Sequence, residues 1–317
     1  MSEPAPFARP AQPAPIAKPA QQNPAVNGHL PVLEVSDLRK DFGELVAVGG
    51  VSFAVQEARS LAIVGESGSG KTTIARMIVG LERPTAGSIT ACGRDRSTPA
   101  RSARERRRRG SEVQIVFQDP YTSLDPRQTA EATIDEVLKL HHGWASPERK
   151  ARIEELTELV GLDQRQARAL PRALSGGQRQ RVAIARALAA EPRVLILDES
   201  VAALDVSIQA QVLNLLADIR DSTGVSYVLI SHDLAVVRQL TDDAIVLHRG
   251  VVVEQGPTAR VLDDPQDDYT KRLRASVPRP GWKPRRGALR ADAAAGSGGS
   301  PPGVSTADTT GEEPTAS

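Results

Sequence analysis

The fold is decided by Gly65-Glu66-Ser67-Gly68-Ser69-Gly70-Lys71-Thr72, where glycines, a lysine and a hydroxyl stand in the pattern of a phosphate-binding loop. The apolar run Leu61–Val64 predicts a strand before the loop, and the spacing of Ile74, Met77 and Ile78 predicts a helix after it. Glycines let successive backbone N–H groups turn inward on a phosphate chain at a helix start, where the helix dipole favours negative charge. An accidental glycine-rich turn is the alternative, and the complete pattern with its flanks argues against it.

The polar side chains of this loop have expected tasks. Lys71 is long enough to reach the β and γ phosphates of ATP, and the Thr72 hydroxyl is a suitable ligand for Mg²⁺. We therefore expect ATP and Mg²⁺ as cofactors. The expected nucleotide contacts of this segment come from Gly65, Glu66, Ser67, Gly68, Ser69, Gly70, Lys71, Thr72 and Thr73.

A pair of carboxylates ends a second apolar run. Val194–Glu199 predicts a buried strand that finishes with Asp198 and Glu199. Carboxyl ends of parallel strands face the crevice where ligands bind, so Asp198 is expected to support Mg²⁺ and Glu199 to polarise a water molecule. Alone, such a pair often only caps a turn. His232 follows the run Tyr227–Ile230 at the same expected edge, although alone it would be a hydrogen-bonded structural histidine.

The composition limits the possible partners. The 317 residues include 40 basic and 39 acidic side chains, so no global field draws the chain to nucleic acid or to an anionic membrane. The single cysteine, Cys92, cannot form an internal disulfide and fits a reducing compartment. No apolar run approaches the ~20 residues needed to cross a bilayer. We expect a cytoplasmic protein that reaches a membrane only by docking.

Three regions are expected along the chain. Residues 1–29 are rich in Pro and Ala, and residues 279–317 in Gly, Ser, Pro and Thr, so both are predicted to be disordered tails. Residues 30–278 alternate apolar runs with helical segments, which predicts an α/β domain with a mainly parallel sheet. Helical spacing predicts an inserted helical subdomain over about 120–175. The run Arg106–Arg109 is interpreted as a solvated face, because no base-stacking aromatic residues surround it.

The family is indicated by Leu174-Ser175-Gly176-Gly177-Gln178-Arg179-Gln180-Arg181, which resembles the signature sequence of ABC ATPases. The order of the other motifs matches that family, since Phe117-Gln118 resembles the Q-loop, Ala203-Leu204-Asp205 the D-loop and His232 the switch histidine. The resemblance covers about Leu33 to Val277. It implies a P-loop NTPase core of the ABC ATPase type, with a mainly parallel sheet, an antiparallel β subdomain and the helical insertion.

The resemblance also implies roles for particular residues. Glu199 would be the general base, His232 would hold the γ-phosphate and the attacking water, and Gln118 would sense the γ-phosphate or Mg²⁺. Phe42 would stack on adenine, although a lone Phe after a strand is otherwise simply core. The signature residues Ser175, Gly176, Gly177 and Gln178 of one subunit would close over the γ-phosphate held by Lys71 and the phosphate loop of another. The Mg²⁺ ligands would be Thr72, Gln118 and Asp198.

The partners implied by the resemblance are other chains of a transporter. A second ABC ATPase subunit would complete a homodimer or heterodimer, transmembrane permease subunits would receive the motion, and an extracytoplasmic solute-binding protein would take part indirectly. The chain would be peripheral, at the cytoplasmic face of the cell membrane. Nucleic acid is not expected as a partner.

Two further segments narrow the resemblance to the peptide and nickel importer branch. They are Asp119–Arg127, and the stretch from Gly256 that contains Tyr269-Thr270, although Asp267 and Asp268 stand where His and Pro are commoner. We expect import of oligopeptides or dipeptides. The alternatives are transport of nickel or another small solute, and a non-transport ABC ATPase that acts on nucleic acid or ribosomes.

Overall fold

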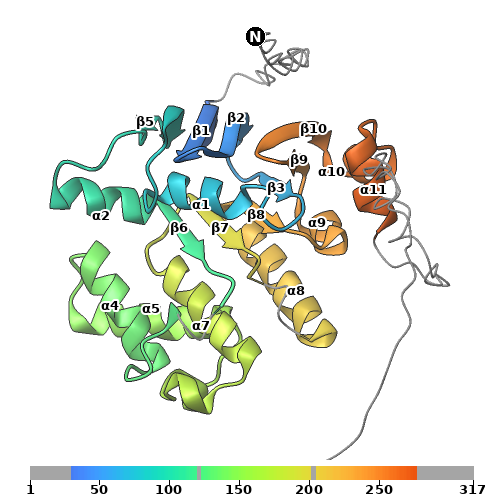
Figure 1. Cartoon of the computed structure of the whole chain (residues 1–317). Coiled ribbons are helices and arrows are strands. Elements are labelled where there is room, and N and C mark those ends of the chain that lie inside the picture. Colours follow the sequence, from blue (N-terminus) through green and yellow to red (C-terminus); the bar gives the residue numbers. More distant parts are fainter. Residues whose placement is uncertain (1–29, 120–122, 201–204, 277–317) are drawn as a thin grey trace, which may run out of the picture. The chain divides into compact units, whose positions relative to one another are not determined.

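Two β-sheets form the framework of the part of the chain that the structure describes (Figure 1). The computed structural model describes residues 30–119, 123–200 and 205–276. The tails predicted over 1–29 and 279–317 lie outside these ranges.

The smaller sheet is antiparallel, with strand order β2-β1-β4-β5. Its strands are β1 (Leu33–Phe42), β2 (Leu45–Val55), β4 (Ala86–Ala91) and β5 (Arg94–Asp95). Successive side chains of a strand face opposite sides, and Leu33 and Val35 of β1 accordingly point into the core while Glu34 between them is exposed. This sheet confirms the antiparallel β subdomain. Cys92 lies in the turn between β4 and β5, where burial raises the pKa of its thiol.

The larger sheet has strand order β10-β9-β3-β8-β7-β6. Only β10 pairs in the antiparallel direction, so the sheet is mainly parallel, as predicted. Its central strands are fully buried, which suits their continuous apolar sequences. The strands are β3 (Ser60–Val64), β6 (Val113–Val116), β7 (Val194–Asp198), β8 (Ser226–Ser231), β9 (Asp243–His248) and β10 (Val251–Pro257).

The register of the parallel strands brings their carboxyl ends to one edge. Val64 of β3 pairs with Ser231 of β8, and Asp198 of β7 pairs with Ile230 of the same strand. Val116, the last residue of β6, pairs with Leu197. The segments that follow these strands therefore start side by side, which is the arrangement that creates a ligand crevice in open α/β sheets.

The helix after the phosphate loop links the two sheets. This helix, α1 (Lys71–Val79), contacts β2 of the smaller sheet and β6 and β7 of the larger one. One apolar cluster runs through both sheets and includes Ile74, Met77 and Ile78 of α1. The helical face predicted from these residues is therefore the buried one.

The other helices lie around the larger sheet and in a separate helical group (Figure 1). Within that group, α4 packs on α5 and α7, and Asp135 of α4 accepts a hydrogen bond from Arg149 of α5 at 2.7 Å. The helices are α2 (Ala103–Glu112), α4 (Ala130–His141), α5 (Ser146–Leu159), α6 (Gln164–Ala167), the 3-10 turn η1 (Pro171–Ala173), α7 (Gly176–Leu188), α8 (Val206–Thr223), α9 (Leu234–Leu240), α10 (Thr258–Asp263) and α11 (Asp268–Ala275).

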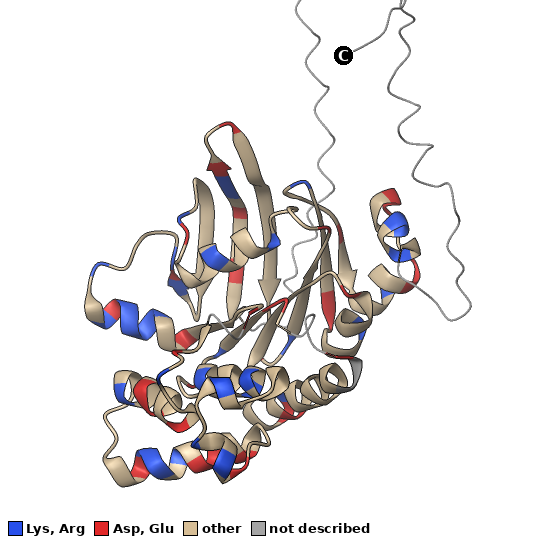
Figure 2. Ribbon diagram, turned by 60° about the horizontal axis from the view of Figure 1, so that its bottom comes forward, with Lys and Arg blue, Asp and Glu red and all other residues tan. Residues whose placement is uncertain are grey.

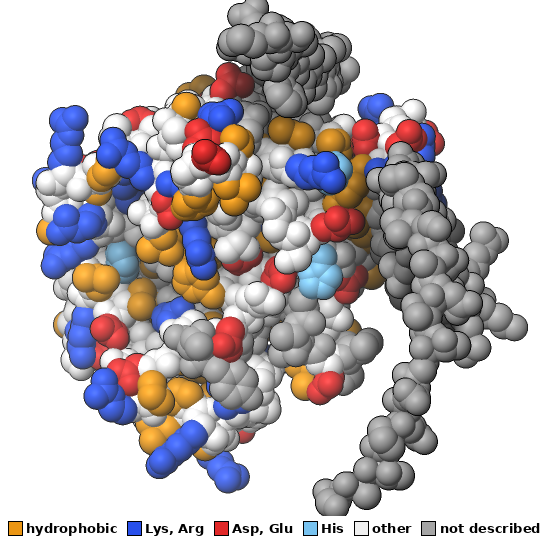
Figure 3. Space-filling view, in the orientation of Figure 1, with side chains coloured by type: hydrophobic (Ala, Val, Ile, Leu, Met, Phe, Trp, Pro, Cys, Tyr) orange, Lys and Arg blue, Asp and Glu red, His pale blue; other side chains and the backbone are white. Residues whose placement is uncertain are grey.

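Basic and acidic residues are both distributed along the described part of the ribbon (Figure 2). Basic residues are most concentrated on α2, where Arg106, Arg107 and Arg108 of the predicted solvated run are exposed. Arg109, the last residue of that run, is instead half-buried and donates to Glu105. On the face seen in Figure 3, Lys and Arg side chains gather at the left. Among the described helices, none combines the length and hydropathy that a bilayer crossing needs.

Candidate functional site

The phosphate loop joins β3 to α1, and its surroundings require glycine at two positions. A Cβ atom at Gly65 would lie 2.2 Å from the carbonyl oxygen of Leu247 in β9. At Gly70, which has φ 104°, a Cβ atom would lie 2.5 Å from the carbonyl oxygen of Ala47 in β2. Both clashing atoms are backbone oxygens of sheet strands, which could move only at a high energetic cost. The loop is therefore held closely between β9 and β2.

The ammonium group of Lys71 lies inside this loop. The residue is 4% exposed, and its Nζ donates to the carbonyl oxygens of Gly65 at 2.8 Å and Glu66 at 2.7 Å. Burial lowers the pKa of Lys71, and the carboxylates of Glu199 and Asp198 oppose that shift. The loop thus holds a buried cation at the place where phosphate oxygens are expected.

Asp198 is a buried carboxylate at the end of β7. Its Oδ1 accepts a hydrogen bond from Thr72 Oγ1 at 3.3 Å, a long contact for such groups. Burial raises the pKa of Asp198, with Glu199 adding to the shift and Thr72 opposing it. Carboxylate and hydroxyl oxygens are ligands that Mg²⁺ prefers. Within the described ranges no cluster of three or more His, Cys, Asp or Glu is placed to hold a metal ion.

Glu199 and His232 lie together at the same edge. The strand β7 ends at Asp198, one residue earlier than the sequence pattern predicted, and Glu199 adopts a left-handed backbone with φ 46°. The N–H group of Glu199 donates to the carbonyl oxygen of Ile230 at 2.9 Å, which anchors it to β8. Its Oε1 lies 3.4 Å from Nδ1 of His232. A carboxylate beside an imidazole, both accessible from the edge, is a suitable arrangement for holding a water molecule and its protons.

Two predicted residues lie at the rim of the site. Gln118 comes two residues after β6 and is exposed, next to the edge where β7 ends. Phe42 ends β1 and is 48% exposed, with Nζ of Lys40 4.7 Å from its ring centroid. Asp41, the residue before Phe42, pairs with Val46 of β2. This part of the β1–β2 hairpin adjoins the phosphate loop, so the ring projects from a place beside the loop. An exposed ring at this place is available for stacking.

The signature residues lie apart from the phosphate loop within this chain. Ser175 caps α7, where its hydroxyl accepts from the N–H of Gln178 at 3.3 Å and its own N–H donates to Gln178 Oε1 at 2.8 Å. Ser175, Gly177 and Gln178 line a hollow of about 230 Å³ that shares no residue with the hollow beside the phosphate loop. Gly176 begins α7. The structure therefore does not bring the two sets of predicted nucleotide contacts together in one subunit.

The groups around the loop fit a bound polyphosphate with a cation. The hydroxyl of Ser69 is buried and has no hydrogen-bond partner among the described residues, while Lys71 holds a positive charge beside it. Ser67 and Gly68 are exposed at the tip of the loop, and Thr73 is half-buried in the first turn of α1. An orphan donor, a buried ammonium group and a helix start all favour negative charge at this point.

These features define the class of the protein as a P-loop nucleotide-binding protein. The ABC transporter family model matches residues 48–202. A putative peptide import ATP-binding protein of Brucella abortus (strain 2308) is 46% identical over 278 residues, which cover 84% of this chain and 81% of that protein. The di/tripeptide transport ATP-binding protein DppF of Pseudomonas aeruginosa is 42% identical over 241 residues, covering 76% of this chain and 74% of DppF.

The solved structures agree with these relatives. An ATP-binding cassette in a dimeric, post-hydrolysis state bound to ADP and Pi aligns with a TM-score of 0.65 at 30% identity, covering 71% of this chain and 98% of that one. The chain belongs to the ATP-binding proteins of ABC transporters, the ATPases that energise transport. The predicted family and fold class are thereby confirmed.

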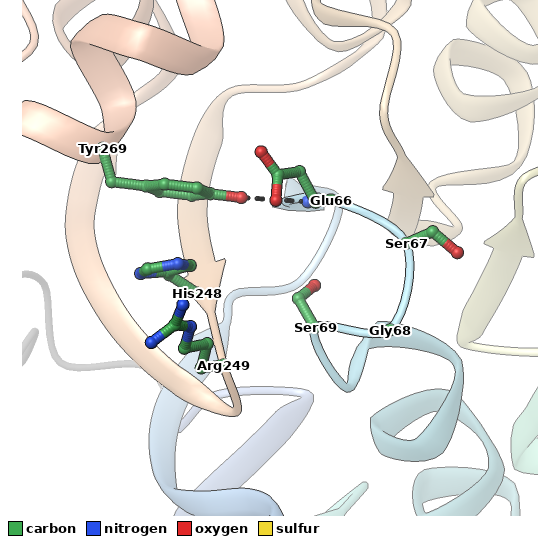
Figure 4. A pocket seen from close by; sticks show the side chains of 7 residues that line it. All are labelled: Glu66, Ser67, Gly68, Ser69, His248, Arg249 and Tyr269. Carbon is green, nitrogen blue, oxygen red and sulfur yellow. Dashed lines mark hydrogen bonds between the residues drawn. The ribbon is translucent and has the colours of Figure 1, made fainter. Parts of the chain in front are cut away.

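Some residues near the site were missed by sequence reasoning, and some predicted ones lie outside the described ranges. His248 and Tyr269 line a hollow of about 250 Å³ together with the phosphate loop (Figure 4). In the sequence, Tyr269 indicates only the importer branch, and no local pattern points to His248. Ala203 and Leu204 of the predicted D-loop are not among the described residues.

Proposed function

We propose that this chain is the ATP-hydrolysing subunit of an importer for oligopeptides or dipeptides. The observation that carries the proposal is the 46% identity to a putative peptide import ATP-binding protein over most of both chains. The importer-like segment around Tyr269 agrees with it. The proposed location is the cytoplasmic face of the cell membrane, and membership in a family that works with permeases supports it.

The edge of the larger sheet supplies the chemistry. Glu199 is proposed as the general base that accepts a proton from water, and His232, 3.4 Å from it, as the residue that orients that water. Lys71 is proposed to hold the β and γ phosphates of ATP and to stabilise charge on the transferring group. Asp198 and Thr72 would hold Mg²⁺, which neutralises phosphate charge when it is bound. Gln118 would report the state of the site to the helical group.

A second ATPase subunit is proposed to complete the site. The signature hollow and the phosphate-loop hollow share no residue, which supports a site built from Ser175, Gly176, Gly177 and Gln178 of one subunit and the loop of another. The related cassette named above was solved as a dimer. The surface of the helical subdomain over about 120–175 would then receive the permease.

The test is uptake of a labelled short peptide by host cells that lack this gene and the other peptide routes. The cells are complemented with the wild-type chain, with Glu199→Gln, or with Glu57→Gln, an exposed carboxylate in the turn before β3. Rescue by wild type and Glu57→Gln but not by Glu199→Gln is expected. Normal uptake in the uncomplemented cells would contradict peptide import and leave the ATPase assignment standing.

A further inference from the structure

The carboxy-terminal helix α11 contacts the phosphate loop through one tyrosine. Tyr269 is 6% exposed, and its hydroxyl accepts a hydrogen bond from the backbone N–H of Glu66 at 3.1 Å (Figure 4). Its ring stacks on His248 of β9 with a centroid separation of 4.0 Å and an interplanar angle of 15°. The phenol is therefore fixed in position by a second ring as well as by the loop.

The peptide unit that Tyr269 contacts is the one that holds Lys71. The N–H of Glu66 and the C=O of Gly65 belong to the same planar peptide, and in a trans peptide they point in opposite directions. Tyr269 binds the N–H, while Nζ of Lys71 donates to the C=O of Gly65 at 2.8 Å. One rigid group thus joins the tyrosine to one of the two hydrogen bonds of Lys71. The other, from Nζ to the carbonyl oxygen of Glu66 at 2.7 Å, involves the next peptide unit.

The start of α11 is itself firmly attached to the larger sheet. Asp267 caps the helix, where its carboxylate accepts from the N–H of Tyr269 at 2.8 Å. The carboxylate of Glu254 in β10 accepts from the backbone N–H groups of Gln266 at 2.9 Å and Asp267 at 3.2 Å. These bonds hold the backbone of Tyr269 in register with β10, independently of the phosphate loop.

The same side of the sheet also holds the far end of the loop. The N–H of Gly250, in the turn between β9 and β10, donates to the carbonyl oxygen of Ser69 at 3.1 Å. The loop is therefore held from outside at both ends, by Gly250 near its end and by Tyr269 near its beginning. Of these two contacts, only the one with Tyr269 comes from a side chain and can be removed by substitution.

We propose that Tyr269 is a positioning residue of the nucleotide site, which holds the Gly65–Glu66 peptide so that its carbonyl group fixes the Lys71 ammonium toward bound phosphate. The proposal rests on the proposed ATPase function. It assigns a role in the phosphate site to the carboxy-terminal helix, which is the last described element of the chain. A displacement of α11 would then loosen Lys71 without touching the catalytic edge.

The test uses two tyrosine-to-phenylalanine variants of the full chain. Tyr269→Phe removes the hydroxyl and keeps the ring that stacks on His248. Tyr227→Phe is the matched control, because the Tyr227 hydroxyl is also buried and donates to a backbone carbonyl, that of Leu216 at 2.8 Å, in the core between β8 and α8. Each variant loses one buried hydrogen bond between a phenol and the backbone, which the hydroxyl of Tyr269 accepts and the hydroxyl of Tyr227 donates.

The first readout needs no ATP hydrolysis. The rate of acylation of Lys71 by a small anhydride is followed by mass spectrometry, with exposed Lys139 as the internal reference. Loss of one buried hydrogen bond corresponds to about a five-fold change in a local opening equilibrium, so Tyr269→Phe is expected to label Lys71 about five-fold faster. Tyr227→Phe is expected to leave the Lys71 rate unchanged. Equal Lys71 rates in wild type and Tyr269→Phe, or equal increases in both variants, would overturn the proposal.

The second readout is steady-state ATP hydrolysis. Tyr269→Phe is expected to raise KM for ATP about five-fold and to lower kcat by a smaller factor, because Lys71 is loosened while Glu199 and His232 are untouched. Tyr227→Phe should keep the wild-type KM. An unchanged KM in Tyr269→Phe would contradict the role toward phosphate. Hydrolysis is measured on the chain assembled with its partner subunits. Absence of hydrolysis in that wild-type complex would count against the proposed function alone, because the labelling result is independent of turnover. His248→Ala keeps the Tyr269 hydroxyl but removes the ring that stacks on it, so this variant should also label Lys71 faster than wild type.

Discussion

Lys71 combines deep burial with a positive charge that only backbone carbonyls and nearby carboxylates offset. Burying a charge in this way costs desolvation free energy, and attraction to a bound anion would offset that cost during function. At the scale of single residues, Lys71 is therefore the side chain whose removal should affect nucleotide binding most directly.

Replacement of Lys71 by Ala should weaken ATP binding about 10- to 100-fold, because hydrogen bonds to charged groups contribute about 1.5–3 kcal/mol each. Binding of a fluorescent ATP analogue measures the change. Lys139→Ala is the control, since the Lys139 ammonium pairs with Asp135 on the surface of α4. Equal affinities for Lys71→Ala and wild type would remove Lys71 from the phosphate site.

The residues of the phosphate site could be predicted from the sequence because each belongs to a short motif. The sequence placed Asp198, Glu199 and His232 at the ends of apolar runs and Lys71 after the loop that follows another such run. The structure has those runs as neighbouring parallel strands. The left-handed backbone of Glu199 could not be predicted, since it follows from the position of β7 against β8 rather than from the residue type. The roles of these residues stay predictions until the variants are measured.

At the scale of secondary-structure elements, α7 and α8 meet at a glycine. A Cβ atom at Gly177 would lie 2.5 Å from Cγ2 of Ile208, a methyl group on the branched carbon that has little freedom to turn away. This close approach fixes the distance between the signature helix and α8. It also explains in structural terms why a small residue stands there.

Gly177→Ala should destabilise the protein by about 1–2 kcal/mol, because overpacking outweighs the gain in helix propensity. Gly110→Ala provides the comparison in α2, where the nearest atom to a new Cβ would be His141 Cε1 at an ordinary 3.5 Å. That variant should be stabilised by about 0.5–1 kcal/mol. Urea unfolding midpoints of both variants test this difference in sign. A stabilised Gly177→Ala protein would show that α7 and α8 can move apart at little cost.

The elements themselves were more predictable than their contacts. Helical spacing predicted the apolar face of α1 and the helices α4 and α5, and apolar runs predicted β3, β7 and β8. The hydrogen bond between Tyr269 and Glu66 joins residues 203 positions apart, and no local pattern in either segment indicates it. Contacts of this kind depend on how β9, β10 and α11 are arranged in space.

At the scale of the whole molecule, the two hollows lined by predicted nucleotide contacts share no residue. A single subunit that bound ATP with its loop alone would leave Ser175 and Gly177 without a phosphate partner. The family assignment and this separation together favour an ATP-dependent pair as the working unit.

Glu199→Gln should bind ATP without hydrolysing it and should accumulate as a closed pair, since the amide cannot accept the proton from water. Light scattering after size-exclusion chromatography with ATP and Mg²⁺ measures the species. The double variant Lys71→Ala with Glu199→Gln should remain monomeric under the same conditions. A purely monomeric Glu199→Gln protein would favour pairing that requires a different ATPase subunit, which co-purification with that subunit would then test.

The left-handed backbone of Glu199 has a consequence for laboratory evolution. A residue with a side chain costs about 1 kcal/mol or more in that conformation, whereas glycine adopts it freely. Glu199→Gly should therefore raise the melting temperature by a few degrees, as a thermal scan would show, while abolishing ATP turnover. A library selected for heat resistance alone would be expected to replace the Glu199 carboxylate with glycine. Thermal selection of this protein therefore needs growth on peptides as a second criterion.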